Sequence, residues 1–188
     1  MAKIVEIKPK PIEQYKVLSQ ITNLEGKRVL EVGCRSGGLG EYLRENTKGL
    51  CYTGIDRNPD IIQQGKDRYP MLHLKCEDVT TYKHKPYDVV LAQDIFKGLG
   101  NTPEALTELK VMIAAMIRLG NTVGFTYTVL HPSKKYKDNK LRLSPWYVAD
   151  FVTNLTPYIQ MRTDFDDHIH SFGLYHGLDK RGKVITLS

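Results

Sequence analysis

The sequence has few cysteines and no long hydrophobic run. Its three cysteines, Cys34, Cys51 and Cys76, are widely spaced and form no Cys-x-x-Cys pair. This excludes a disulfide-stabilised scaffold, and we expect free thiols in a reducing compartment. The longest apolar runs, at residues 111–117 and 123–130, are far shorter than the ~20 residues of a membrane-spanning helix. We therefore expect no membrane association.

Two further signals are missing. Residues 1–9 lack the apolar stretch of a secretory signal peptide, so we expect a cytoplasmic protein. The closely spaced histidines His168, His170 and His176 have no fourth ligand at the spacing of a zinc site. We therefore expect them to line a loop or pocket, and no metal is predicted.

The composition is that of a globular protein, with 41% apolar and 26% charged residues. The 188 residues fit one domain, so we expect a single domain over 1–188 that begins with a helical lead at 1–24. The net charge is +6, and residues 131–143 carry five basic residues against one acidic residue. Because most of the excess lies there, we expect a basic insertion on the substrate side. A small molecule is the expected partner, with nucleic acid as the alternative through this segment.

Short strand and helix patterns alternate along the chain, which favours an α/β fold with a parallel sheet and helices on both faces. The expected strands of the first part are at residues 28–32, 50–56, 71–75, 87–92 and 121–130. Two more, at 158–163 and 183–187, are expected to form a closing hairpin around a loop at 164–182. The prediction is a mostly parallel seven-stranded sheet with one antiparallel strand.

Ligands of such sheets bind beyond the carboxyl ends of the strands. The first expected strand ends in Glu31, and the turn that follows contains Gly33 and Gly37. Glycines permit a sharp turn and close approach of the backbone to a ligand. A carboxylate at Glu31 would repel a pyrophosphate, and Arg35 breaks the Gly-x-Gly-x-x-Gly pattern, so a dinucleotide is disfavoured. An ammonium or sulfonium group suits this turn better.

Acidic residues also follow the next two strands. Asp56 stands 23 residues beyond Gly33, a spacing at which an acid accepts from both hydroxyls of a ribose, although it could also cap a helix. Asp78 follows the third strand and could accept from an adenine amino group, although it could also be a solvated loop acid. Together with Glu31, these acids outline a site for S-adenosylmethionine.

Four segments, at residues 28–38, 52–60, 75–79 and 87–99, resemble in order the motifs of the class I, Rossmann-like S-adenosylmethionine-dependent methyltransferases. The resemblance implies that the methionine part of the cofactor is held near the first turn and the fourth strand, by Glu31, Gly33, Cys34, Arg35, Gly37 and Gln93. It implies that Asp56 and Arg57 frame the ribose and adenine, and that Asp78 and Val79 read the adenine. Residues 88–93 and 116–121 are also similar to MetW-type proteins.

Two features depart from the family pattern. Arg35 replaces the middle glycine of the first motif, and a positive φ there would cost arginine about 1 kcal/mol. The segment Phe96-Lys97-Gly98-Leu99 replaces the acid and histidine that many small-molecule methyltransferases carry before the leucine. These departures motivate an alternative in which the chain is a regulatory subunit that binds S-adenosylmethionine without turnover.

Methyl transfer from a sulfonium is an in-line displacement that depends mainly on alignment. Asp94 follows the fourth strand and is the candidate general base or substrate-orienting acid, unless it only lines the cofactor pocket. The candidate substrate-binding residues lie at or after the fifth strand: Tyr127, His131, Lys134, Lys135 and Tyr136. We expect an anionic small-molecule acceptor, with RNA or protein as alternatives.

Overall fold

The structure, a computed structural model, describes residues 12–94, 99–128, 145–153, 158–166 and 169–175. Its strands are β1 (Arg28–Val32), β2 (Cys51–Asp56), β3 (Leu74–Cys76), β4 (Tyr87–Ala92), β5 (Gly120–Thr128), β6 (Tyr158–Asp166) and β7 (Ile169–Tyr175). Its helices are α1 (Ile12–Ser19), α2 (Gly38–Asn46), α3 (Pro59–Arg68), α4 (Pro103–Leu119) and α5 (Pro145–Thr153).

The strands form one sheet in the order β3-β2-β1-β4-β5-β7-β6. All pairs among β1 to β5 are parallel, which confirms the predicted α/β fold with a parallel sheet. The chain starts in the middle at β1, moves outward to β3 and then returns to the other side of β1 with β4. This reversal creates the crevice between β1 and β4 at which open α/β sheets bind ligands.

The far edge of the sheet differs from the predicted hairpin. Strand β7 pairs antiparallel with both β5 and β6, and it lies at Ile169–Tyr175, within the segment predicted as a loop. The final strand predicted at 183–187 lies outside the described residues. The loop prediction was wrong because the sequence of this strand contains polar residues and a glycine, which are not typical of a strand. The segment is a strand because it pairs with β5, and such pairing cannot be seen in the composition.

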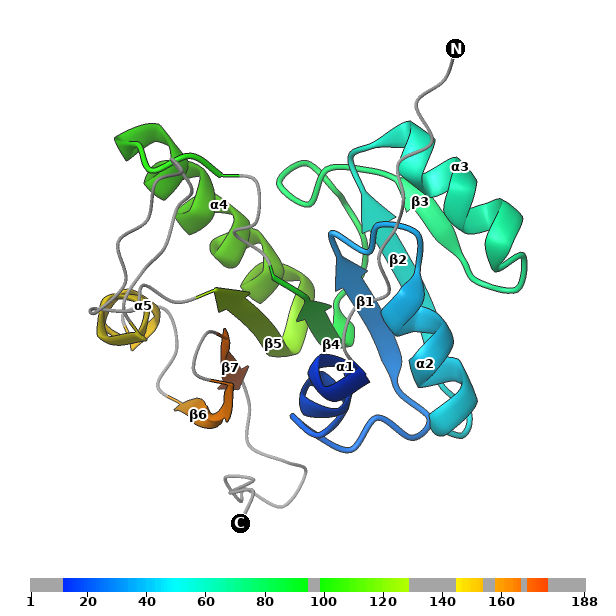
Figure 1. The fold of residues 1–188 in the computed structure, drawn as a ribbon, viewed down its shortest axis with the longest axis horizontal. Coiled ribbons are helices and arrows are strands. Elements are labelled where there is room, and N and C mark those ends of the chain that lie inside the picture. Colours follow the sequence, from blue (N-terminus) through cyan, green and yellow to red (C-terminus); the bar gives the residue numbers. More distant parts are fainter. Residues whose placement is uncertain (1–11, 95–98, 129–144, 154–157, 167–168, 176–188) are drawn as a thin grey trace.

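Helices cover both faces of the sheet, with α4 and α5 on one side and α2 and α3 on the other (Figure 1). Alternate residues of the central strands enter two different cores. Leu30 and Val90 pack in the core that contains α4 and α5 residues, whereas Val29, Val89 and Leu91 pack in the core that contains α1 and α2 residues. This period of two is the pattern of strands that are buried on both faces.

Local sequence explains where the helices begin. The Asn58 side chain accepts from the backbone N–H groups of Asp60 and Ile61 at 3.0 and 3.2 Å, and Pro59 occupies the first turn of α3. Thr102 accepts from the Ala105 N–H at 3.2 Å in the same way at the start of α4. These caps satisfy backbone donors that have no partner within the helix, and the proline that follows each capping residue suits the first turn.

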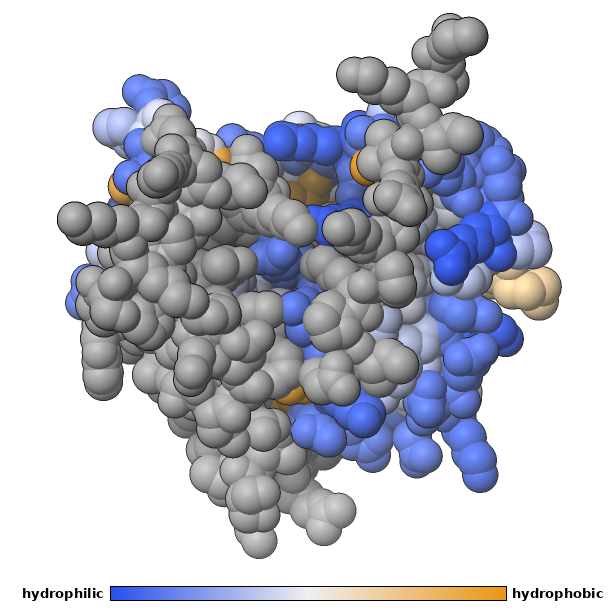
Figure 2. Space-filling view, in the orientation of Figure 1, coloured by the Kyte–Doolittle hydropathy of each residue, from blue (hydrophilic) through white to orange (hydrophobic). Residues whose placement is uncertain are grey.

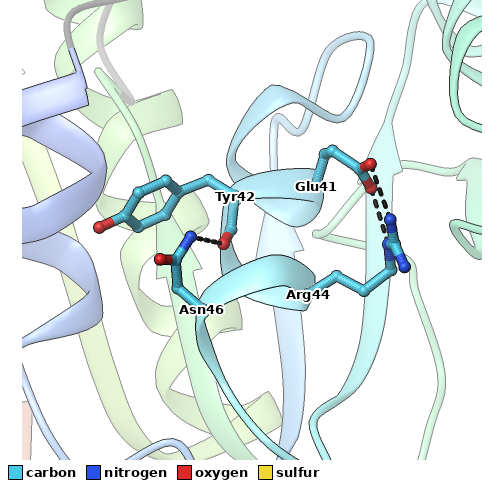
Figure 3. A network of polar contacts seen from close by, with 4 residues as sticks. All are labelled: Glu41, Tyr42, Arg44 and Asn46. Carbon is cyan, nitrogen blue, oxygen red and sulfur yellow. Dashed lines mark hydrogen bonds and ion pairs between the residues drawn. The ribbon is translucent and has the colours of Figure 1, made fainter.

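Helix α2 carries two polar contacts, which lie on opposite sides of the helix (Figure 3). Arg44 donates to both carboxylate oxygens of Glu41 at 2.8 Å, and the Asn46 side chain donates to the Tyr42 carbonyl at 2.7 Å. Such exposed pairs add little stability. The attachment of α2 therefore depends on its buried face.

The described surface in the view of Figure 2 is mostly hydrophilic, with small hydrophobic areas in recesses and one pale area that protrudes at the right edge. The longest described helix is α4 with 17 residues. No helix among the described residues combines the length and the apolar character needed to cross a bilayer.

Gly40 lets α2 approach β2 closely, and this contact can be tested. A Cβ at Gly40 would collide with the Tyr52 ring, which is itself buried. We expect Gly40→Ala to lower the free energy of unfolding by about 1–3 kcal/mol through overpacking, although alanine is the better helix former. Urea unfolding should show this loss, with the exposed Glu45→Ala on the same helix as the control. An increase in stability would contradict this packing.

Candidate functional site

The carboxyl ends of β1, β2 and β4, the turn after β3 and one face of α4 enclose a cavity of about 230 Å³. It lies at the crevice that the reversal of strand order creates. Eight of the predicted cofactor and catalytic residues line it: Gly33, Arg35, Asp56, Arg57, Asp78, Val79, Gln93 and Asp94.

The turn after β1 has an unusual backbone at three positions. Gly33, Arg35 and Gly37 have φ angles of 69°, 53° and 86°. The strain expected for Arg35 is therefore present, since the left-handed region disfavours residues with a Cβ. The turn is fixed by the Ile55 carbonyl, which accepts from the Gly33 and Cys34 N–H groups at 2.8 and 3.0 Å.

Asp56 connects this turn to the ends of two other strands. Its carboxylate accepts from the Arg35 N–H and from the Asn58 N–H, both at 3.0 Å. Its backbone carbonyl accepts from the Glu77 N–H at 3.0 Å, next to the end of β3. Each carboxylate oxygen has two lone pairs, so the side chain keeps acceptor capacity toward the cavity that it lines.

Asp78 is held in place by the residue two positions after it. One carboxylate oxygen accepts from the Thr80 hydroxyl at 2.7 Å and from the Thr80 N–H at 2.8 Å. These hydrogen bonds hold the pKa of Asp78 below its usual range. The side chain is therefore an ionised acceptor at neutral pH. Val79 beside it is buried in the main core and adds an apolar surface to the cavity.

The end of β4 contributes Gln93 and Asp94. The Gln93 amide donates to the side-chain oxygen of Gln14 in α1 at 2.6 Å. Asp94 has a φ of 52°, and its N–H donates to the Thr126 hydroxyl of β5 at 3.0 Å. A second strained residue at the cavity wall is thus held by a bond to the neighbouring strand. Such strain is concentrated at functional sites.

Three predicted cofactor residues lie behind the cavity wall. Glu31 is 2% exposed and accepts from the Tyr52 hydroxyl at 2.5 Å, and burial followed by the charge of Glu31 raises the pKa of Tyr52. Burial, and then the charges of Glu31 and Asp56, raise the pKa of the Cys34 thiol. Gly37 directly precedes α2 as its N-cap, and a Cβ there would lie 2.9 Å from Leu72. These residues support the turn from within.

Sequence reasoning did not identify two lining residues from α4. Glu108 and Met112 are four residues apart and therefore share a face of the helix. Arg57 donates to Glu108 across the cavity at 3.0 Å. The apolar spacing of α4 indicated only a core helix. The sequence carries no signal that distinguishes this face, because the placement of α4 beside the cavity depends on tertiary packing.

The lining is rich in negative charge. It carries five carboxylates, from Asp56, Glu77, Asp78, Asp94 and Glu108. Its guanidinium groups, from Arg35 and Arg57, are fewer. A phosphate-rich ligand would be repelled, whereas a ligand with a positive charge and several hydroxyl donors is favoured.

The predicted substrate residues are only partly accounted for. Tyr127 is fully buried in the main core and does not line the cavity, and burial raises the pKa of its hydroxyl. His131, Lys134, Lys135 and Tyr136 lie outside the described residues.

Comparison with known proteins finds similarity to methyltransferases. A family described as a methyltransferase domain matches residues 30–115. The phthiotriol/phenolphthiotriol dimycocerosates methyltransferase of Mycobacterium leprae is 30% identical over 128 residues, which are 66% of this chain and 45% of that protein. The fatty-acid O-methyltransferase of Mycolicibacterium smegmatis is 34% identical over 126 residues, 64% of this chain and 43% of that protein.

The chain thus spans about half the length of these relatives. Among solved structures, magnesium protoporphyrin IX methyltransferase from Synechocystis with bound S-adenosylmethionine has a TM-score of 0.65 at 14% identity, covering 88% of this chain and 81% of that one. This likeness concerns the fold. The MetW-type resemblance stays a prediction. Residues 30–115 thus match a methyltransferase-domain family, and the strand order agrees with the resemblance of the sequence motifs to the class I, Rossmann-like S-adenosylmethionine-dependent methyltransferases.

Proposed function

We propose that this protein transfers a methyl group from S-adenosylmethionine to a small, anionic acceptor. The observation that carries the proposal is the row of strand-end groups along one cavity, with Asp78 after β3, Asp56 after β2 and the Gly33 turn after β1. Asp78 would accept from the adenine amino group, and Asp56 from the ribose hydroxyls. The methionine part would then lie beside Gly33 and Gln93.

The residues of the cavity fit this cofactor. A Cβ built at Gly33 meets no atom within 4 Å, so its backbone faces open space in which a ligand can approach closely. The Asp56 and Asp78 carboxylates supply acceptors for a group with hydroxyl and amino donors. The negative lining favours a sulfonium over an uncharged or anionic ligand.

S-adenosylmethionine, when bound, supplies a methyl group on a sulfonium. When the acceptor atom attacks the methyl group in line, the carbon–sulfur bond breaks and the rest of the cofactor leaves as a neutral thioether. The residues of the chain act mainly by holding the two reactants at the right angle and distance. A protonated acceptor must also lose its proton. Asp94 lines the cavity, and its backbone is held by Thr126, so its carboxylate is our candidate for receiving that proton or orienting the acceptor.

The proposed acceptor is small and negatively charged for two reasons. Residues 131–143, which follow β5 and lie outside the described residues, carry five basic residues against one acidic residue. One relative is named for methylating a fatty acid, whose carboxylate is an anion at neutral pH. Lysines near the acceptor would bind such a group through charge-assisted hydrogen bonds.

A second candidate function is a cofactor-binding subunit without turnover, which the strained Arg35 in the cavity wall favours. A methyl-release assay separates the two functions. We expect the wild-type chain to form S-adenosylhomocysteine when it is incubated with S-adenosylmethionine and pools of fatty acids, phenols and other small acids. Tight binding with no release from any pool, including RNA and protein pools, would favour the subunit.

Asp56→Ala tests the cofactor site. Hydrogen bonds to a charged group contribute about 1.5–3 kcal/mol each, so we expect the dissociation constant for S-adenosylmethionine to rise tenfold or more in calorimetry. The control is Asp60→Ala, an exposed acid in the first turn of α3 that does not line the cavity. Circular dichroism would verify that both variants are folded. Unchanged affinity in Asp56→Ala would argue against the proposed ribose contact.

The basic segment has its own test, a chain in which Lys134, Lys135 and Lys137 are all changed to alanine. We expect KM for an anionic acceptor to rise, because the charges that attract it are gone, while affinity for S-adenosylmethionine stays the same. Raised salt should reduce the difference between the variant and the wild type. If KM for the acceptor does not change, the segment does not bind it.

A further inference from the structure

Helix α1 lies over the point where the order of strands reverses. Its residue Leu18 is buried in the same core cluster as Val29 of β1 and Val89 and Leu91 of β4, and Figure 1 shows the helix beside these strands. No residue of α1 lines the cavity among the described residues. The helix nevertheless reaches the cavity wall through one side chain, Gln14.

Gln14 and Gln93 form a buried amide pair. Their exposed fractions are 7% and 8%, and the Gln93 nitrogen donates to the Gln14 oxygen at 2.6 Å. A buried amide without a partner costs about 1–3 kcal/mol, so each side chain holds the other in a defined position. Gln93 lines the cavity and Gln14 does not. Gln14 can therefore act on a ligand only through Gln93.

The position of Gln93 indicates which part of the ligand it meets. Along the sheet order β3-β2-β1-β4, the proposed function assigns the adenine to the end of β3 and the ribose to the end of β2. The amino-acid part then falls at the ends of β1 and β4, and Gln93 directly follows β4. This part carries both an ammonium and a carboxylate.

A side-chain amide has two N–H donors and an oxygen with two lone pairs. The bond to Gln14 uses one donor of Gln93 and thereby fixes which way the amide faces. The other donor and the oxygen stay available for groups of opposite kinds, as an ammonium and a carboxylate are. If the amide could rotate freely, its donor and its oxygen would exchange places, and neither would face a fixed group of the ligand.

We propose that Gln14 is a positioning residue for the amino-acid end of the cofactor, and that α1 acts in recognition of that end through the Gln14–Gln93 bond. The adjacent residue supports this role for α1. Tyr15 packs on Tyr42 of α2, and burial together with the charge of Glu31 raises the pKa of its hydroxyl. Two consecutive residues of α1 thus lie beside the groups that follow β4 and β1: Gln14 accepts from Gln93, and the Tyr15 hydroxyl lies close to Gly38 at the start of α2. The inference rests on the proposed function.

The test compares the variants with the wild type on two ligands, one with that end and one without it, so that the sulfonium charge, which only S-adenosylmethionine carries, cancels when each ligand's affinity is expressed relative to the wild type. S-adenosylmethionine has the amino-acid part, whereas 5′-methylthioadenosine lacks it. Gln14→Met keeps the shape of the side chain but loses the hydrogen bond. We expect it to raise the dissociation constant for S-adenosylmethionine about tenfold and to change that for 5′-methylthioadenosine by no more than about twofold. Gln93→Met should also lower the affinity for S-adenosylmethionine. The double variant should bind it no more weakly than Gln93→Met alone, since Gln14 acts through Gln93.

Calorimetry on the full chain would measure these affinities, with the exposed Lys16→Met on α1 as the matched control. Gln14→Leu is a second variant in case Gln14→Met does not fold. Three outcomes would overturn the inference, because the pair would then be only structural: an equal loss of affinity for both ligands, an unchanged affinity for S-adenosylmethionine, or failure of both variants to fold. Failure of the wild type to bind S-adenosylmethionine would overturn the proposed function itself.

Discussion

The candidate site depends on the hydrogen bonds that Asp56 makes at the end of β2. Its carboxylate holds the N–H groups of Arg35 and Asn58, and its carbonyl holds the N–H of Glu77. One residue therefore connects the turn after β1, the start of α3 and the turn after β3. Backbone groups at strand ends have no ladder partners, so a fixed acceptor at this point determines how these segments meet.

Two layers of polar groups surround the turn after β1. The inner layer is buried, with the Glu31 carboxylate bonded to Tyr52 below the turn. The outer layer lines the cavity with an excess of carboxylates. The Ile55 carbonyl and the Asp56 carboxylate hold the turn in its strained shape, and the carboxylates of the outer layer determine which ligands are attracted. Strain at Arg35 and Asp94 is consistent with this division, because both residues lie in the outer layer and are held by bonds to neighbouring segments.

The centre of the sheet could be predicted well from the sequence. Strands β1 and β4 were predicted with their observed bounds because buried parallel strands are nearly continuous apolar runs. Strand β3 is shorter than expected, and β7 was missed because its order comes from pairing with β5. In the site, the acids at strand ends could be found because parallel strands end at one edge. Gln14 and Glu108 could not, since they reach the site from helices whose placement depends on tertiary packing.

The central claim is that the cofactor extends across the ends of four strands, from β3 through β2 and β1 to β4. A crystal structure of the chain with S-adenosylhomocysteine would test this most directly. We expect the adenine beside Asp78 and Val79, the ribose hydroxyls on the Asp56 carboxylate, and the amino-acid part beside Gln93. A ligand bound in the reverse direction, or outside this cavity, would contradict it.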